Sequence, residues 1–162
     1  MVSRSSAQGQ GPGAKGQGYR QLLAWQRAHE LALAMFRLTQ PLARKESWLY
    51  RQCMRSTVSV PANIAEGYSR GSLREYIQFL NIARGSLAET EYYLLFMREA
   101  GLFPEAQVRE LDILRAESAS LLLGLIRSLQ AKDVSRNREV RRSGEGKAEY
   151  SLASLDDNGL DP

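Results

Sequence analysis

The fold is decided by the stretch YIQFLNIARGSLAETEYYLLFM, Tyr76 to Met97, in which small and apolar residues recur at alternating steps of four and three. That spacing places them along one side of an α-helix, as in the seam of a helical bundle. The seam consists of Tyr76, Leu80, Ala83, Leu87, Thr90, Leu94 and Met97. A second row runs beside it and contains Phe79, Ile82, Ser86, Tyr93 and Phe96. The stretch therefore predicts a long helix with two faces to bury.

Start and stop signals bracket this helix. Ser72 and Glu75 match a capping box, in which the serine hydroxyl accepts a hydrogen bond from the Glu75 backbone N–H. Gly101 predicts the helix end, because glycine readily adopts the left-handed turn that follows many helices. Pro104 suits the first turn of a following helix. The predicted helix runs from Ser72 to Ala100.

Three further segments have helical periodicity, over residues 22–42, 47–67 and 104–129. Gly67 is expected to end the second of them in a left-handed turn. No segment shows the alternation of a strand. The sequence predicts an all-α fold, an antiparallel up-down-up-down four-helix bundle with short connections.

The folded unit is expected over residues 19–130. Residues 1–18 form a Gly/Gln-rich arm, and residues 131–162 form a charged tail that is basic first and acidic at its end. Both are predicted to be disordered, because neither has enough apolar residues to outweigh the entropy cost of ordering. A single cysteine, no apolar leader and no membrane-length apolar run predict a cytoplasmic protein without membrane contact.

A bundle this small needs about one apolar stripe per helix to close its core, yet the helices over 22–42 and 72–100 carry two. The surplus would leave an exposed apolar patch on a monomer. A homo-oligomer is therefore favoured over a monomer whose extra aromatic residues thicken the core. The predicted interface residues are Trp25, Phe36, Phe79 and Tyr93.

The motif SVPANIAEGYSR, residues 59–70, places a proline inside a predicted helix. Pro61 has no N–H, so the carbonyl of Thr57 loses its helical partner and a kink is expected. Asn63 lies close enough to hydrogen-bond the freed backbone groups, and Glu66 follows on the next turn. This pattern favours a structural kink formed by Pro61, Asn63 and Glu66 over a catalytic site.

The same residues carry a family resemblance. SVPANIAEGYSRGS, EYIQFLNIARGSLAETEYYL, LLAWQRAHELALAMF and RQCMRSTV closely resemble the bacterial four-helix-bundle family named after the 23S ribosomal RNA intervening-sequence protein. The likeness covers roughly residues 22–129 and neither tail. It implies a homopentameric barrel related to the accessory proteins of diversity-generating retroelements, which are basic pentamers that bind nucleic acid and a reverse transcriptase.

Catalysis and metal binding are not favoured. The chain has one histidine, one cysteine and no Glu-x-x-His pair of the kind found in di-iron bundles. His29 lies on an apolar stripe and is expected to be a packed or interface histidine, and Cys53 lies on a predicted inner face as a small buried hydrophobe. The sequence predicts a non-enzymatic protein with no cofactor, no metal and no catalytic residue.

Basic residues give a modest indication of nucleic-acid binding. The formal charge is +4 and the isoelectric point is about 9.4. On an oligomer, arginines of the second and third helices would form a ring that attracts phosphates. A solvated face neutralised by neighbouring glutamates explains the pattern equally well. The predicted contact residues are Arg51, Arg55, Arg70, Arg74 and Arg84.

Two functions remain open at the level of sequence. The first is a homo-oligomer that holds structured RNA or an RNA–DNA hybrid by its backbone, because no base-reading motif is present. The alternative is a protein-interaction scaffold, such as an accessory subunit of a retroelement reverse transcriptase.

Overall fold

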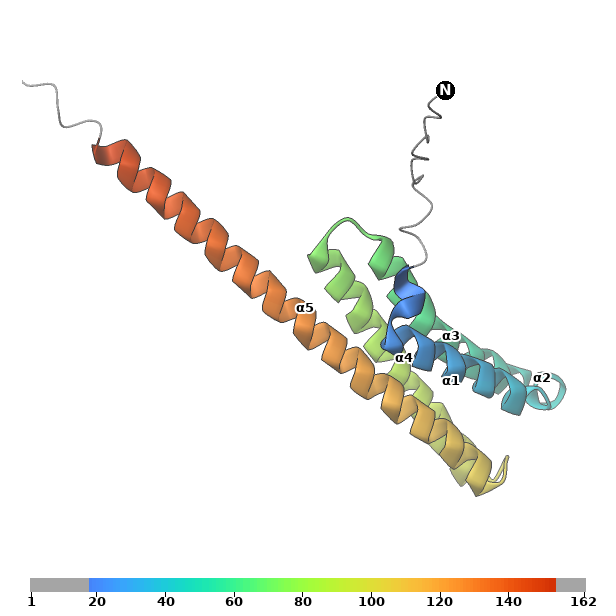
Figure 1. The fold of residues 1–162 in the computed structure, drawn as a ribbon. Helices are drawn as coiled ribbons and strands as arrows, with labels where there is room; N and C mark the ends of the chain where they lie inside the picture. The colour runs from blue at the N-terminus through green and yellow to red at the C-terminus, as the bar shows by residue number, and fades with distance from the viewer. Residues whose placement is uncertain (1–17, 154–162) are drawn as a thin grey trace, which may run out of the picture. The chain divides into compact units, whose positions relative to one another are not determined.

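The computed structural model describes residues 18–153, with side chains described as far as residue 143 except at 136, 140 and 141 (Figure 1). These residues are almost entirely helical, which confirms the predicted all-α class, and no strand occurs among them. Residues 1–17 and 154–162, parts of the two predicted arms, lie outside the described residues. The helices are α1 (Leu23–Thr39), α2 (Leu42–Lys45), α3 (Ser47–Ser69), α4 (Leu73–Glu99) and α5 (Glu105–Ala153).

The chain divides into two compact units between Ile126 and Arg127. We call the described part of the first unit, residues 18–126, the bundle; it contains α1 to α4 and the first part of α5. We call residues 127–153, the described part of the second unit, the α5 extension.

The predicted helix over 22–42 ends earlier than expected, and a second, short helix follows it. α1 ends at Thr39 and the short α2 begins at Leu42. Pro41 lies between them and has no N–H with which to continue the hydrogen-bond ladder of α1. The Thr39 hydroxyl donates instead to the Met35 carbonyl at 2.7 Å, within the last turn of α1.

The bundle closes around an apolar core. The predicted α4 seam is buried from Leu80 to Met97, while Tyr76 at its start is half-buried. Fully buried side chains come from α1, α3, α4 and α5, because each carries an apolar face at helical spacing. The largest of them are Leu31, Met35, Leu49, Ile64, Leu80, Met97, Leu122 and Ile126.

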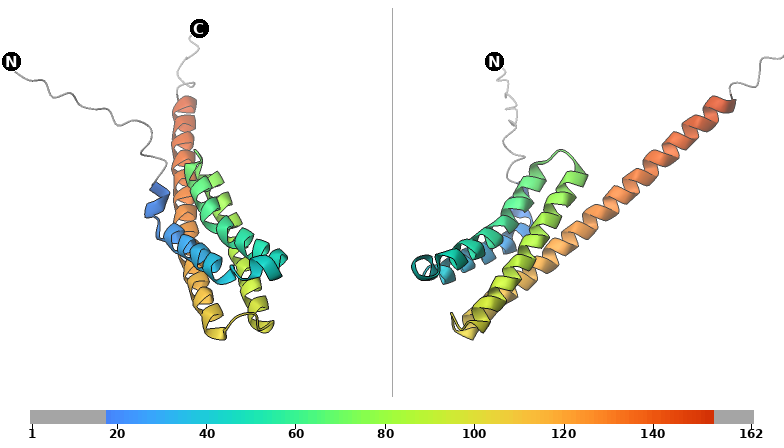
Figure 2. Two further views of the ribbon diagram at one scale, coloured as in Figure 1. Left: turned by 90° about the vertical axis from the view of Figure 1, so that its right-hand side faces the viewer. Right: turned by 180° about the vertical axis from the view of Figure 1, so that it is seen from behind.

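α3 and α4 lie side by side in the bundle, and α1 packs along α3 (Figures 1 and 2). Gly67 permits the close approach of α3 to α4. A Cβ atom at Gly67 would lie 2.7 Å from the Phe79 Cβ and 2.8 Å from the Tyr76 Cδ2, distances that real Cβ atoms do not adopt. The prediction that Gly67 ends α3 is wrong, because α3 continues to Ser69 and needs Gly67 for packing.

The two ends of α4 differ in how they match the sequence signals. Ser72 occupies the extended position before the helix, but its side chain makes no capping hydrogen bond, so the predicted capping box is wrong. The predicted left-handed Gly101 is confirmed with φ of 63°. The N–H of Leu102 donates to the Met97 carbonyl and that of Gly101 to the Arg98 carbonyl, each at 3.1 Å, as in a Schellman motif.

α3 continues through Pro61, which is buried. Side chains around it bond backbone carbonyls one turn earlier: the Thr57 hydroxyl donates to the Cys53 carbonyl at 2.6 Å, and the Asn63 amide donates to the Ser59 carbonyl at 2.7 Å. Asn63 therefore bonds the backbone near the proline, although not at the Thr57 carbonyl that the proline frees. The predicted kink stays a prediction.

The α5 extension differs from the expected tail. Residues 131–153 are helical, where the sequence led us to expect disorder. The segment contains no proline, and alanine, lysine and arginine within it have high helix propensity. Extending a helix that is already folded avoids the unfavourable nucleation step. Low apolar content therefore excluded a core for this segment but did not exclude a helix.

Candidate nucleic-acid interface

All five arginines predicted to contact nucleic acid are exposed. Arg51 and Arg55 belong to α3, Arg74 and Arg84 belong to α4, and Arg70 lies in the connection between the two helices. All five therefore lie at the surface. They differ in whether they form an ion pair within the chain.

Arg55 and Arg70 are engaged within the chain. Arg55 forms an ion pair with Glu89 across α3 and α4, and its Nε donates to the Gln52 side-chain oxygen at 3.2 Å. Arg70 forms an ion pair with Glu66 one turn earlier. The predicted site residue Glu66 is therefore an exposed carboxylate that holds an arginine. For these two arginines the solvated, neutralised face is the better description.

Arg51, Arg74 and Arg84 make no ion pair with any residue that the structure describes. Their guanidinium groups are therefore available to an anion from outside the chain. Such groups are the common donors to phosphate oxygens in nucleic-acid complexes.

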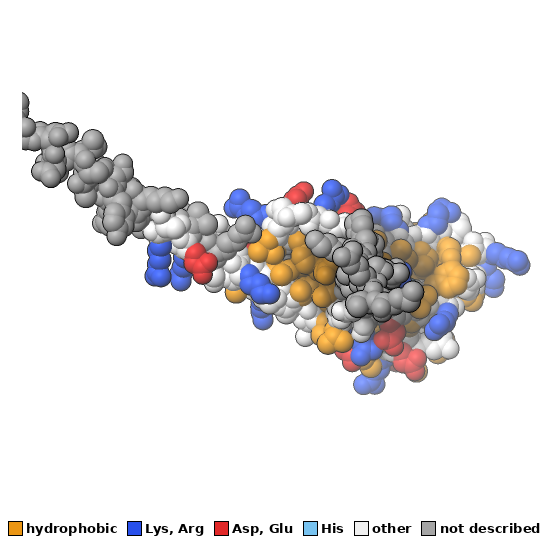
Figure 3. Space-filling view, turned by 45° about the horizontal axis from the view of Figure 1, so that its top comes forward, with side chains coloured by type: hydrophobic (Ala, Val, Ile, Leu, Met, Phe, Trp, Pro, Cys, Tyr) orange, Lys and Arg blue, Asp and Glu red, His pale blue; other side chains and the backbone are white. Residues whose placement is uncertain are grey.

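The arginines of the bundle do not form a single patch. Arg84 precedes Glu91 by two helical turns and so lies on the same side of α4. Glu91 forms an ion pair with Arg115 of α5 at 3.3 Å, so that side of α4 is turned towards α5. Glu89, which holds Arg55 of α3, lies on a different side. In the space-filling view, basic side chains lie mainly around the edge of the bundle's visible face, with hydrophobic side chains across its middle (Figure 3).

The predicted interface aromatics have contacts within the chain. The Trp25 ring stacks on His29 with centroids 4.8 Å apart. The Tyr19 and Trp25 rings lie in an edge-to-face arrangement, with their centroids 5.2 Å apart. The Arg70 guanidinium lies 4.9 Å from the Phe79 ring centroid, a cation–π distance. His29 is therefore a ring-stacked surface residue.

Tyr93 and Phe36 complete the predicted interface set. Tyr93 is half-buried, and its hydroxyl lies 3.5 Å from side-chain oxygens of Gln52 and Glu89. Phe36 is 41% exposed and is the most open of the four predicted residues. The oligomer interface itself stays a prediction.

Sequence reasoning missed several exposed apolar residues outside the two predicted stripes. Leu23 is 64% exposed and was not assigned to the interface, whereas Tyr92, which the sequence places in the surplus aromatic band of the helix over 72–100, is 58% exposed. Tyr92 lies seven residues after Gly85, and no atom lies within 4 Å of a Cβ placed at that glycine. No described helix of the same chain therefore packs closely against α4 at Gly85. The helical spacing of Ile82, Gly85 and Tyr92 was the available signal for this open face.

Cys53 is a buried residue of the core, as expected. Burial raises the pKa of its thiol to about 12, so the reactive thiolate does not form near neutral pH. Burial likewise raises the pKa of Tyr76 to about 12, with a smaller contribution from Tyr68.

No cluster of metal-ligating side chains occurs among the described residues. Within the same part of the chain, no helix is both long and apolar enough to cross a membrane.

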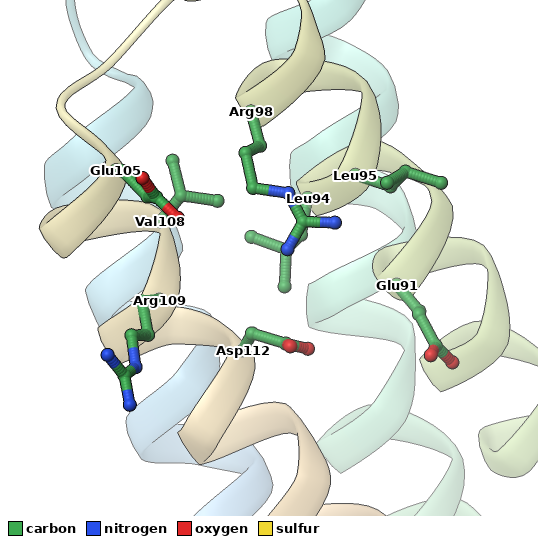
Figure 4. A pocket seen from close by; sticks show the side chains of 8 residues that line it. All are labelled: Glu91, Leu94, Leu95, Arg98, Glu105, Val108, Arg109 and Asp112. Atoms are coloured by element: carbon green, nitrogen blue, oxygen red, sulfur yellow. The ribbon is translucent and has the colours of Figure 1, made fainter.

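A cleft of about 380 Å³ lies between the end of α4 and the start of α5 (Figure 4). Arg98 reaches into the cleft, while Arg109 points away from it. Two of its carboxylates already hold Arg115: Asp112 at 2.7 Å and Glu91 at 3.3 Å. Acidic and basic side chains both line the cleft, and the ion pair between Glu91 and Arg115 joins α4 to α5.

These features define a small helical bundle with an apolar core and a surface of mixed charge. The family model of the 23S rRNA-intervening sequence protein matches residues 20–124, and the chain belongs to this family. The match ends two residues before the bundle does, so the α5 extension lies outside it.

A solved structure supports the assignment. The chain is similar to a crystal structure of a protein with unknown function from the S23 ribosomal protein family of Bacteroides thetaiotaomicron, with 28% sequence identity and a TM-score of 0.62. The similarity covers 64% of this chain and 98% of the other. No curated protein matches the chain.

Proposed function

We propose that the protein is a non-enzymatic homo-oligomer that binds structured RNA, or an RNA–DNA hybrid, through arginines of α3 and α4. The observation that carries the proposal is the exposure of Arg51, Arg74 and Arg84 without an ion pair among the described residues. The family, named for a protein of the 23S rRNA intervening sequence, points to RNA as the polyanion. Binding of this kind is led by the phosphate backbone and weakly dependent on sequence.

Assembly is part of the proposal. Exposed apolar side chains on α1 and α4, including Phe36, Ile82 and Tyr92, favour association between copies of the chain. We propose an up-down-up-down bundle in a cyclic homopentamer, as the family resemblance implies. A ring repeats each unpaired arginine around its axis, which strengthens the field that attracts phosphates.

Charge reversal tests the contact residues. Full-length protein with Arg51→Glu, Arg74→Glu and Arg84→Glu is compared with wild type by fluorescence anisotropy of a labelled RNA hairpin over a salt series. The matched control reverses Arg37, Arg44 and Arg109, which are also exposed and without an ion pair among the described residues but lie on α1, α2 and α5, outside the two helices of the proposed contact. Both variants change the net charge equally.

We expect the contact variant to lose more than tenfold in affinity at low salt. The slope of log K against log salt should fall by about 0.7–0.9 for each phosphate contact removed. The control should lose less, because it changes only the general field. Equal losses in both variants would show that net charge, and not this set of arginines, governs binding.

The second candidate is a protein-interaction scaffold in which nucleic acid is secondary, such as an accessory subunit of a reverse transcriptase. The exposed apolar residues favour it, because they suit a protein partner as well as a second copy. A reverse transcriptase gene beside this one, together with an oligomer that ignores RNA, would favour the scaffold.

A further inference from the structure

We propose that the α5 extension is a basic helical arm that binds a nucleic-acid backbone, as a contact surface separate from the arginines of α3 and α4. The inference rests on the proposed nucleic-acid binding and adds a second site to it. The arm lies outside the residues that match the family model, so it is a feature of this chain beyond the shared bundle.

The positive charge of the chain is concentrated in the first part of this arm, residues 127–142. Residues 127–142 contain six basic and two acidic residues, a net charge of +4. The whole chain also has a formal net charge of +4, so its other residues balance to zero. Over residues 20–126, thirteen basic residues face eleven acidic ones. Residues 127–142 thus carry an excess twice that of the much longer segment before them, and the whole α5 extension, with seven basic and four acidic residues, carries +3.

Helical geometry gathers part of this charge into a stripe. At about 100° per residue, Arg127, Arg138 and Arg142 fall within a sector of about 60° around the helix axis. All three are exposed, and none forms an ion pair with a described residue. The acidic residues Asp133 and Glu139 lie outside this sector by the same geometry. Asp133 accepts a hydrogen bond from Asn137 at 3.5 Å.

The chemistry of the arm favours a nucleic acid over a membrane or a partner helix. A helix that lies on a membrane needs a continuous apolar face. Among the described side chains of residues 127–143 none is buried, and Val134, which is 52% exposed, lies beside the arginine stripe, about 20° from Arg127 around the helix axis. A coiled-coil partner needs an apolar seam, but the spacing that begins at Leu129 continues to Asp133 and Arg136.

The helix also lowers the cost of binding. Arg127 and Arg142 are separated by about 22 Å along a helix with a rise of 1.5 Å per residue. The backbone between them is already ordered, so its conformational entropy is not lost on binding as it would be for a disordered tail. Arginine is suited to such a stripe because its planar guanidinium can donate two hydrogen bonds to one phosphate.

The test uses full-length protein with Arg127→Gln, Arg138→Gln and Arg142→Gln. Glutamine has a helix propensity close to that of arginine, so the variant removes charge without favouring unfolding of the arm. The control replaces the same three residues by lysine, which keeps the charges. Circular dichroism compares helix content, and anisotropy of a labelled RNA hairpin over a salt series measures binding.

We expect the glutamine variant to bind at least tenfold more weakly at low salt, with a salt slope reduced by about two to three for three lost contacts. The lysine variant should retain the slope. An unchanged slope in the glutamine variant would overturn the inference, and so would an equal loss in the lysine variant. Binding of anionic lipid vesicles as tight as that of RNA would also overturn it.

The two proposals fail in distinguishable ways. If the Arg51, Arg74 and Arg84 variant loses affinity while the arm variant does not, the arm is not a contact and the proposed function stands. If only the arm variant loses affinity, the arm stands and Arg51, Arg74 and Arg84 are not contact residues. If wild-type protein binds no RNA at low salt, both are wrong.

Discussion

The bundle and the α5 extension differ in side-chain burial and in charge. In the part of the chain that the structure describes, every buried side chain belongs to the bundle, and the extension has none. The bundle has nearly balanced charges, whereas residues 127–142 hold an excess of +4. Packing therefore sets the fold in the bundle, while the extension is helical without a buried side chain among those described. Mutations in the two regions should affect different measurements.

The largest change in the free energy of unfolding is expected from a substitution in the core of the bundle. Ile64 is fully buried on α3, so Ile64→Ala should lower the free energy of unfolding by about 2–5 kcal/mol. Val58 on the same helix is 45% exposed, and Val58→Ala should cost much less. Denaturant unfolding at one fixed protein concentration measures both. Similar losses for the two variants would contradict the assigned core.

A smaller loss in the free energy of unfolding is expected from a substitution where α3 and α4 meet. Gly67→Ala places a methyl group 2.7 Å from the Phe79 Cβ, which forces the two helices apart. Overpacking of this kind costs about 1–3 kcal/mol. The same denaturation experiment measures it, and an increase in stability would show that the approach at Gly67 is looser than described.

At Gly85, a substitution is expected to raise the free energy of unfolding. No atom of the chain lies within 4 Å of a Cβ at this position, so Gly85→Ala adds helix propensity without a clash. The gain should be about 0.5–1 kcal/mol. Light scattering on the variant shows whether assembly is retained. Destabilisation together with dissociation would indicate that a second copy covers this face of α4.

The smallest effect on the bundle is expected from the α5 extension. Ala131→Gly weakens the helix locally by about 1 kcal/mol. Circular dichroism should report lower helix content, while the unfolding midpoint of the bundle stays unchanged because the two units are separately compact. A lower midpoint would mean that the extension and the bundle unfold as one unit.

Periodicity predicted most of the fold. The α4 seam and the left-handed Gly101 are local features, and both were readable because the hydrophobic spacing and the turn chemistry agree. Gly67 was misread because its neighbours, Phe79 and Tyr76, come from another helix. The helix of the α5 extension was not predicted, because low apolar content excludes a core but charged residues can still extend an existing helix.

The candidate interface was predictable as a set of residues but not as a surface. Exposure of the five arginines follows from their positions outside the seams. The pairing of Arg55 with Glu89 joins residues 34 positions apart and requires the packing of α3 against α4. Only the structure, therefore, separates the neutralised arginines from Arg51, Arg74 and Arg84.

The most direct test is light scattering of the purified full-length protein, with and without a structured RNA, at low and high salt. The account predicts a homo-oligomer of defined mass that takes up RNA at low salt and releases it at high salt, because phosphate contacts are weakened by competing ions. An oligomer whose mass is unchanged by RNA at every salt concentration would contradict the claim that this protein binds nucleic acid.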